Sequence, residues 1–251
     1  MQLNLFAYLY LSYLYPLSYD LTVVVLWLGK LILSVRNVPK NYRNVTGVMA
    51  SNKSEGSAMF ESTLERDLLM QLDFDSRVEF YDVQPVKIEW LDDAGKLRSY
   101  TPDVLVRYRH DGRVDHILYE VKYRSDIKEN WSILKPKFKA AIRYAKQRGW
   151  RFKLITEVEI RTTFLQNVKF LLPFLKRGPD QEADMLLIKE ALKQHAEISI
   201  SELLAALCHN PWNQAALIPT LWYLIASGQL GCELHNQPLT MSSLIWRVKH
   251  G

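Results

Sequence analysis

The chain has 251 residues and a net charge of +5 at neutral pH, and hydrophobic residues make up 48% of it. This composition is that of a globular protein with one large or two small domains. The two cysteines exclude a disulfide framework and a cysteine zinc site, and they fit a reducing cytoplasm. The modest basic excess is compatible with an anionic partner such as a nucleic acid.

Residues 1–35 form an apolar leader that is unlike the rest of the chain. Pro16, Ser18 and Asp20 divide it into two pieces, each shorter than the roughly 20 residues that span a bilayer. A secretory signal has a basic n-region and a small-residue cleavage site, and this leader has neither. Three interpretations stay open: an over-extended gene start with Val35 as the true first codon, an appended segment that anchors or packs, and a membrane-spanning helix, which is the least favoured.

Residues 36–56 are polar and are predicted to form an extended arm. Two interpretations are equally supported, an arm that lies along DNA phosphates and an ordinary solvated segment. The basic residues along this arm are Arg36, Lys40, Arg43 and Lys53.

A helix is predicted to begin at Ser57, because apolar residues then recur at helical spacing. Glu61 and Glu65 fall within the same arc as those apolar residues, where a carboxylate needs a partner. In the first turn a carboxylate complements the helix dipole, which accounts for Glu61. Glu65 lies deeper in the predicted helix, so it is the candidate site residue and Glu61 is the alternative.

Residues 77–90 alternate in polarity and are predicted to form one strand beside the segment that follows. Residues 83–85 mark a kink or an edge in it, because Pro85 has no N–H to donate to a neighbouring strand. Residues 92–96 are predicted to form a turn that delivers the chain to the next pair of strands.

Two apolar-rich runs, residues 104–109 and 115–122, flank the dipeptide Asp111-Gly112. This dipeptide adopts the positive φ angles of a two-residue hairpin turn more readily than most. The sequence therefore predicts an antiparallel hairpin in which the residues on either side of the turn face each other.

The register of that hairpin brings three charged side chains together. With Leu105 opposite Leu118, Asp103 is opposite Glu120, and Lys122 shares a face with Glu120. Directly opposed carboxylates are destabilising unless one is protonated or both bind a cation. A hard cation such as Mg²⁺ prefers oxygen ligands of this kind, and Lys122 favours the ionised form of the carboxylates.

Residues 130–149 predict a helix that Pro136 interrupts early, with Ile142 among its inward residues. Its outer face is basic and is a candidate surface for DNA contact. Residues 152–156 predict a short strand that pairs in parallel after this crossover helix, which completes an αβββαβ core. The basic residues of the outer face are Lys135, Lys137, Lys139, Arg143, Lys146 and Arg148.

Beyond a helix at residues 161–176, the Gly-Pro pair in residues 177–180 predicts a domain break. Three helical patterns and a two-stranded wing follow, the order of a winged helix. The third pattern, residues 214–227, has no basic residue where a recognition helix uses Arg or Lys, so protein contact is favoured over DNA contact. Four aromatic residues are candidates for either the core or a partner surface: Trp212, Trp222, Tyr223 and Trp246.

Pro102-Asp103, followed by Glu120-Val121-Lys122, is the PD…(D/E)xK pattern of the restriction-endonuclease-like nucleases. The chain further resembles TnsA, the endonuclease subunit of a heteromeric transposase, from about residue 36 to the C-terminus. The segments that carry this resemblance are residues 62–69, 72–75, 84–88, 100–103 and 119–122.

The resemblance implies an α/β fold with a restriction-endonuclease-like nuclease core and a C-terminal winged-helix-like α domain. It divides the chain into the leader 1–35, the arm 36–56, an endonuclease domain 57–177 and a C-terminal domain 178–251 for partner or DNA contact.

The resemblance also implies catalytic roles for Glu65, Asp103, Glu120 and Lys122. Mg²⁺, for which Mn²⁺ would substitute, is expected on Asp103, Glu120, the Val121 carbonyl and Glu65. Lys122 is expected to position the attacking water. Some relatives carry Gln at the position of Glu120.

The implied activity is cleavage of the 5′, non-transferred strands at transposon ends during cut-and-paste transposition in the bacterial cytoplasm. The implied partners are transposon-end DNA, a TnsB-like transposase, a TnsC-like AAA+ ATPase regulator and a target-selection or RNA-guided complex. Two alternatives stay open, a nuclease of a restriction or defence system and a non-catalytic DNA-binding adaptor.

Overall fold

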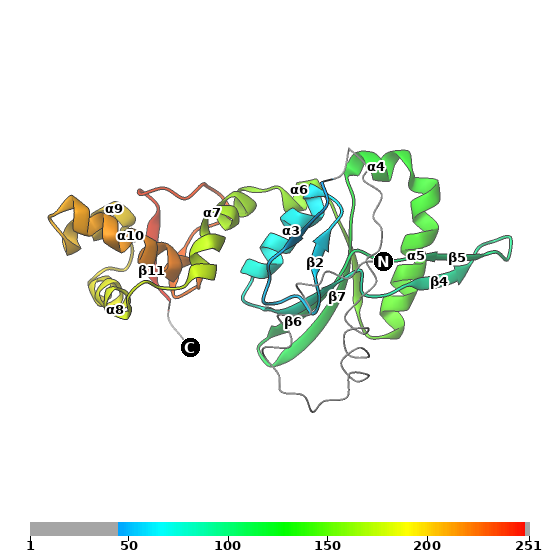
Figure 1. The fold of residues 1–251 in the computed structure, drawn as a ribbon, viewed down its shortest axis with the longest axis horizontal. Coiled ribbons are helices and arrows are strands. Elements are labelled where there is room, and N and C mark those ends of the chain that lie inside the picture. The colour runs from blue at the N-terminus through cyan, green and yellow to red at the C-terminus, as the bar shows by residue number, and fades with distance from the viewer. Residues whose placement is uncertain (1–44, 249–251) are drawn as a thin grey trace, which may run out of the picture. The chain divides into compact units, whose positions relative to one another are not determined.

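The structure is a computed structural model that describes residues 45–248 (Figure 1). The predictions for the leader 1–35 and for residues 36–44 of the arm lie outside the described residues. Within residues 45–248 no helix is long and apolar enough to cross a membrane.

The centre of the fold is a four-stranded sheet in the order β3-β6-β7-β8. The first three strands are antiparallel, and β8 pairs in parallel with β7. With the helices α3 and α5, the order along the chain is α3-β3-β6-β7-α5-β8, as the sequence predicts. The bounds are α3 Thr63–Phe74, β3 Val78–Val83, β6 Val104–His110, β7 Arg113–Val121, α5 Trp131–Gln147 and β8 Arg151–Ile155.

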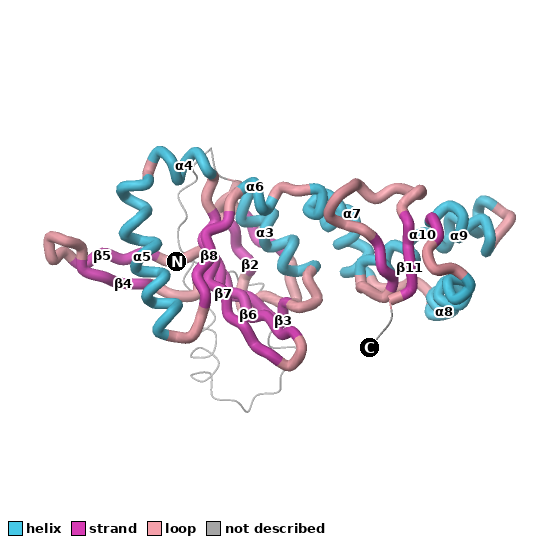
Figure 2. The backbone as a smooth tube through the Cα atoms, turned by 180° about the vertical axis from the view of Figure 1, so that it is seen from behind, coloured by secondary structure: helices cyan, strands magenta, loops and turns pink. Residues whose placement is uncertain are grey.

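The two helices cover opposite faces of this sheet, which Figure 2 shows from behind. Side chains of β6 and β7 alternate between the faces, so Val106 and Tyr119 pack with α3, whereas Leu118 packs with α5. Each face therefore buries its own apolar side chains, and the register of β7 against β6 is strongly specified.

The predicted hairpin is confirmed in its turn and in its register. Asp111 and Gly112 have positive φ angles of 48° and 73°. Leu105 is paired with Leu118, and Val104 with Tyr119. This pairing brings Asp103, just before β6, to the level of Glu120.

The prediction that a helix begins at Ser57 is wrong. Residues 58–60 form β2 (Ala58–Phe60), which pairs with β1 (Gly47–Met49), and α3 begins only at Thr63. Ser62 ends the extended segment because its hydroxyl accepts a hydrogen bond from the Glu65 N–H, the geometry of a helix N-cap. The four-residue spacing from Phe60 to Leu64 is that of a helix but here joins a strand to a helix.

The described part of the predicted arm, residues 45–56, is packed against the hydrophobic core between α3 and the main sheet, which we call the first core. Lys53 donates to the backbone carbonyls of Asp75, at 2.6 Å, and Leu72, at 3.4 Å, near the C-terminal end of α3. Burial lowers the pKa of Lys53, against the attraction of Asp75 and Asp73. This ammonium complements the carbonyl end of a helix, so Lys53 stabilises the fold of this segment.

The prediction of a single strand over residues 77–90 is also wrong. The chain leaves the main sheet after β3, where Gln84 has a positive φ of 53° and Pro85 follows. The next residues form a separate hairpin of β4 (Ile88–Leu91) and β5 (Leu97–Tyr100), which extends away from the main sheet (Figure 1). The predicted turn at residues 92–96 joins these two strands.

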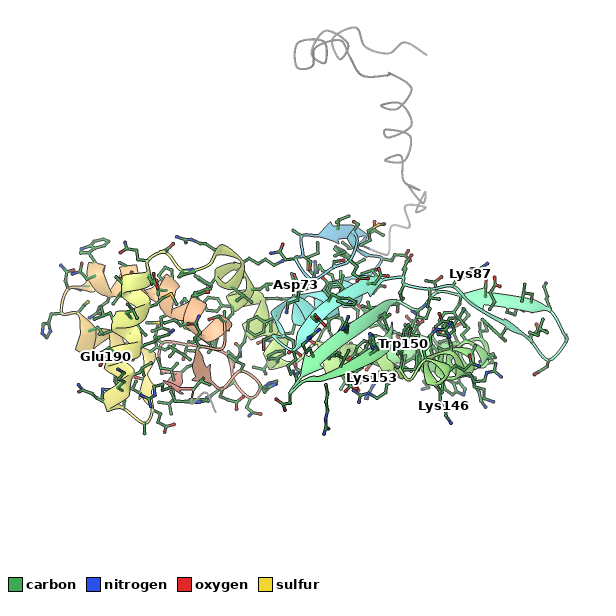
Figure 3. The ribbon with its side chains drawn as sticks, turned by 90° about the horizontal axis from the view of Figure 1, so that it is seen from below. Asp73, Lys87, Lys146, Trp150, Lys153 and Glu190 are labelled. Carbon is green, nitrogen blue, oxygen red and sulfur yellow. The ribbon has the colours of Figure 1, made fainter. Side chains whose placement is uncertain are left out.

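A short helix, α4 (Arg124–Glu129), precedes α5, and Pro136 lies inside α5 without ending it. The basic outer face is present, and Lys146 projects from it (Figure 3). The prediction that Ile142 points inward is wrong, because its side chain is 51% exposed. Gly149, with φ 70°, follows the helix as predicted.

After β8 come α6 (Glu157–Ile160) and α7 (Thr163–Arg177), and Gly178 ends α7 at the predicted break. The C-terminal elements have a hydrophobic core of their own, the second core, and Leu171 of α7 is part of it. Leu165 of the same helix is part of the first core. The division of packing between the two cores therefore falls within α7, earlier in the chain than the loop at Gly178.

The C-terminal elements follow the predicted order, with one additional short strand, β9. Their three-stranded sheet has the order β10-β11-β9. Trp222 is buried in the second core, but Trp212 is 83% exposed and Trp246 is at the surface. The bounds are α8 Glu182–Ala191, η1 Leu192–Gln194, β9 Ile198–Ser199, α9 Ile200–Leu207, α10 Pro211–Ala226, β10 Leu230–Cys232 and β11 Leu244–Arg247.

Gly231 is a position where no side chain fits. It is paired with Trp246 across β10 and β11, and a Cβ atom there would lie 2.0 Å from the indole Nε1. We expect Gly231→Ala to displace the indole and to lower the free energy of unfolding by about 1–3 kcal/mol. Urea unfolding followed by tryptophan fluorescence measures this. Gly56→Ala, where nothing lies within 4 Å, is the control, and equal loss in both variants would contradict the prediction.

Candidate active site

The hairpin end brings Asp103, Glu120 and Lys122 together as predicted. The Lys122 ammonium lies 3.0 Å from Oε1 of Glu120 and 3.5 Å from Oδ2 of Asp103. It also donates to the carbonyl of Val121, at 3.0 Å. Asp103 is fixed by the Val121 N–H, which donates to Oδ2 at 2.7 Å. One ammonium thus contacts two carboxylates and a carbonyl that lie at one end of the sheet.

Burial dominates the electrostatics of this group. Glu120 is only 3% exposed. Burial and then the neighbouring Asp103 raise its pKa to about 7, against the attraction of Lys122. Burial likewise raises the pKa of Asp103. Lys122 responds in the opposite sense: burial lowers its pKa, but Asp103 and Glu120 more than offset this and raise it, so the amine stays protonated.

Glu65 is near this group, but not for the reason that the sequence indicates. It is the third residue of α3, in the first turn, where its carboxylate accepts from the Glu61 N–H at 2.8 Å and from the Ser62 hydroxyl at 2.9 Å. The inference that it lies deep in a helix without a local partner is wrong. Burial and then Asp103 raise its pKa, while the hydrogen bonds from the Glu61 N–H and the Ser62 hydroxyl, and then Lys122, lower it.

Glu61, the alternative, is held by Gln84, whose side-chain amide donates to Oε1 at 2.9 Å. The backbone N–H of Gln84 also donates to the carbonyl of Asp103, at 2.8 Å. Gln84 therefore connects Glu61 with Asp103, a positioning role that the sequence analysis did not assign. Its place at the predicted kink was the available signal.

Tyr100 is a second residue that the sequence analysis did not single out as a site residue. Its hydroxyl is buried and has no hydrogen-bond partner among the described residues. Burial raises its pKa, with smaller contributions from Glu120 and Asp103. Tyr100 stands three residues before Asp103, so its neighbourhood in the chain was the signal that could have found it.

The side chains of this site include oxygen donors of the kind that hold a hard cation. Among residues 45–248 no group of three or more His, Cys, Asp and Glu side chains is arranged to hold a metal ion. Oε2 of Glu120 is nevertheless buried and without a hydrogen-bond partner in the described chain. Two carboxylates and a carbonyl, one of them carrying an unused buried oxygen, fit the ligand chemistry of a hard divalent cation such as Mg²⁺.

The raised pKa of Glu120 predicts how the stability of the metal-free protein depends on pH. Because this pKa, about 7, is above the ordinary 4.5, the folded state holds the proton more tightly than the unfolded chain. The free energy of unfolding should therefore fall as pH rises from about 4.5 to about 7 and lose nothing more from this group above it.

Glu120→Gln should remove that part of the pH dependence. Urea unfolding in EDTA at the two ends of the window measures the variant against wild type, with the exposed Glu55→Gln as the control. A constant difference between wild type and Glu120→Gln across the window would contradict a buried, titrating Glu120.

Two family models match the chain. The first, TnsA-like endonuclease N terminal, matches residues 75–157, and the second, TnsA endonuclease C terminal, matches residues 159–234. A search of the curated proteins finds no match. Both matched families are endonuclease domains, and the first match contains the hairpin with Asp103, Glu120 and Lys122. The mixed α/β fold and these matches define an endonuclease. The chain belongs to the TnsA endonuclease family, whose members are endonucleases of Tn7-like transposons.

Proposed function

We propose that this protein hydrolyses the 5′, non-transferred strands at the ends of its transposon as a Mg²⁺-dependent nuclease of the PD-(D/E)xK type. The observation that carries the proposal is the convergence of Asp103, Glu120 and Lys122 at one end of the sheet. The order α3-β3-β6-β7-α5-β8 around them supports a restriction-endonuclease-like core. A TnsB-like transposase would cut the 3′ strands.

In this proposal Asp103, Glu120 and the Val121 carbonyl would hold Mg²⁺, or Mn²⁺ in its place, and Glu65 would support them directly or through water. The bound cation would stabilise negative charge on the scissile phosphate and on the leaving 3′ oxygen. The Val121 N–H orients Asp103 by donating a hydrogen bond to it. Glu120 is buried, so the surrounding side chains restrict its orientation.

Lys122 positions and polarises the attacking water as a cation. Its raised pKa keeps the amine protonated, so it donates hydrogen bonds and does not remove the proton of the water. The ammonium and a divalent cation would compete for the carboxylates of Asp103 and Glu120. A cation held by these carboxylates would weaken their ion pairs with Lys122, whose ammonium would then be able to donate to the attacking water.

The C-terminal elements support a winged-helix assignment, because the order α8-β9-α9-α10-β10-β11 and the sheet order β10-β11-β9 match that topology. Helix α10 has no basic residue, and Trp212 near its start is 83% exposed. These features favour a protein partner over DNA for this helix. We assign the domain to contact with a TnsB-like transposase and a TnsC-like ATPase regulator, with a target-selection or RNA-guided complex acting through them.

A strand-specific cleavage assay on transposon-end DNA tests the function. The purified chain and its partner transposase are combined with Mg²⁺, and each strand is labelled separately. The proposal expects 5′-strand cutting that requires this chain and a divalent cation. Cutting of both strands without the partner would favour a restriction or defence nuclease, and cutting of neither with intact DNA binding would favour a non-catalytic adaptor.

A further inference from the structure

A hollow of about 380 Å³ lies beside the packed helices α3 and α7 and is lined by cationic side chains. We call it the α3–α7 hollow. Its charged lining residues are Arg66, Asp67, Arg161 and Lys169. Asp67 is the one carboxylate among them in the described chain, so the lining carries three positive charges against one negative charge.

Asp67 uses both of its oxygens on these cations. Lys169 lies 2.8 Å and Arg66 3.3 Å from Oδ1, and the Nε of Arg161 lies 3.0 Å from Oδ2. Asp67 itself is buried at 2% exposure. Burial raises its pKa, but hydrogen bonds and attraction from Lys169, with those from Arg161 and Arg66, hold it below its ordinary value. The carboxylate is therefore ionised and cancels one of the three positive charges.

A purely structural ion pair does not require this arrangement. One cation would be enough to join the buried Asp67 of α3 to α7, and each further cation adds repulsion between like charges. The three cationic side chains are 34%, 40% and 40% exposed, so each is partly accessible to solvent although all three contact Asp67. An anion in the hollow would neutralise the two remaining charges.

The N-terminus of α7 adds to the attraction of an anion. Thr162, the residue at the N-cap of this 15-residue helix, lines the hollow and makes no side-chain capping hydrogen bond within the described chain. The first turn of a helix carries positive partial charge and attracts phosphate oxygens. Here it acts beside side-chain cations that already favour the same ligand.

The hollow borders the elements that hold the candidate active site. Thr63, in its wall, is the first residue of α3 and receives a hydrogen bond from Arg161, at 2.8 Å. The Arg161 guanidinium also lies 5.5 Å from the ring centroid of Tyr123, which directly follows Lys122. Arg161 therefore links the lining of the hollow to the residue that follows Lys122.

We infer that the α3–α7 hollow binds a backbone phosphate of the DNA strand that is being cut, at a position flanking the scissile phosphate. This inference rests on the proposed nuclease function. The ligand chemistry is that of a phosphodiester monoanion, held by Lys169, Arg66 and Arg161 as charge-assisted donors. Asp67 keeps these donors in place and limits the affinity of the hollow for anions.

Binding of the full chain to a fluorescein-labelled transposon-end duplex, in EDTA and over a series of salt concentrations, tests the inference. Lys169→Gln should weaken binding and reduce the slope of log Kobs against log salt by about 0.9, the value for one lost phosphate contact. Asp67→Asn should instead bind more tightly than wild type, because it removes the carboxylate that competes with phosphate.

Lys193→Gln is the matched control, since it removes one charge from an exposed pair with Glu190 outside the hollow. A Lys169→Gln slope equal to that of this control, or weaker binding by a folded Asp67→Asn, would overturn the inference. If Asp67→Asn does not fold by circular dichroism, the Lys169→Gln slope decides alone. Excess inorganic phosphate should weaken the wild type more than Lys169→Gln, and equal competition would also count against the hollow.

The outcome is separable from the proposed nuclease function, because binding is measured without a divalent cation. Wild-type cutting with an unchanged Lys169→Gln slope would remove the phosphate subsite and leave the nuclease. The expected slope change with no wild-type cutting would keep the phosphate subsite and remove the nuclease function. Absence of any DNA binding by the wild-type chain overturns the inference.

Discussion

Cutting of the 5′ strand is expected to slow by about a hundredfold or more in each of three variants: Asp103→Asn, Glu120→Gln and Lys122→Ala. Cutting of the 3′ strand by the partner transposase should continue in all three. In the proposed mechanism, removing either carboxylate takes away a charged ligand of the cation. Removing Lys122 takes away the ammonium that is proposed to position the water. Cut-and-paste movement should then shift towards replicative cointegrates, which a mating-out assay or sequencing of the products detects.

The three variants should differ in their response to Mg²⁺. Mg²⁺ is expected to raise the melting temperature of the wild type, and the carboxylate variants are expected to lose this rise, because binding to the folded state is weakened. Lys122→Ala should keep or increase that rise, because this variant lacks the ammonium that contacts Oε1 of Glu120 and Oδ2 of Asp103 in the wild type.

Asp115→Asn is the control for both measurements. It changes a carboxylate on the same hairpin, but one that is 65% exposed and paired with Arg151 at 3.2 Å. Its cutting and its Mg²⁺ response should match the wild type. Normal cutting by Asp103→Asn, or loss of the Mg²⁺ response in Lys122→Ala alone, would show that the assigned roles are wrong.

Asp73→Ala is expected to lower the free energy of unfolding by about 3 kcal/mol without a direct effect on the chemistry. Asp73, labelled in Figure 3, is buried at 7% exposure. Its Oδ1 accepts from the hydroxyls of Ser51, at 2.6 Å, and Tyr81, at 3.0 Å. Its Oδ2 lies 2.9 Å from the ammonium of Lys176. The carboxylate thus joins the N-terminal segment, β3 and α7 to α3.

Most of the expected cost comes from the hydroxyl of Tyr81, a fully buried side chain that would lose its charged partner. Lys176 is 41% exposed and would be hydrated instead. Urea unfolding of Asp73→Ala, Tyr81→Phe and the double variant measures the coupling, with the exposed Asp93→Ala as the control. Additive losses in the double variant would mean that the two groups do not stabilise the fold together.

The sequence by itself determined the hairpin and the convergence at its end. Asp111-Gly112 selects a two-residue turn, and strict alternation along the strands then fixes which residues face one another. Because a slip of one residue would turn Leu118 out of its core, the pairing that aligns Asp103 with Glu120 was predictable from local chemistry alone.

The start of α3 and the end of β3 were decided by the tertiary structure. A periodicity of 3.6 residues does not distinguish Phe60 on a strand from Phe60 on a helix, and only its pairing in β2 with β1 separates the two. In the same way Gln84 and Pro85 suggest a kink, but only the structure shows that the chain leaves for a separate β4–β5 hairpin and that Gln84 contacts Asp103 and Glu61 there.

The charge clusters away from the hairpin were also decided by the tertiary structure. Asp67 and Arg161 are 94 positions apart in the chain, and Asp73 and Lys176 more than a hundred, yet each pair is in direct contact. Turn chemistry and side-chain periodicity act over a few residues, so they determine a hairpin. An ion pair between helices depends on how α3 and α7 pack, and that depends on the shape of the whole core.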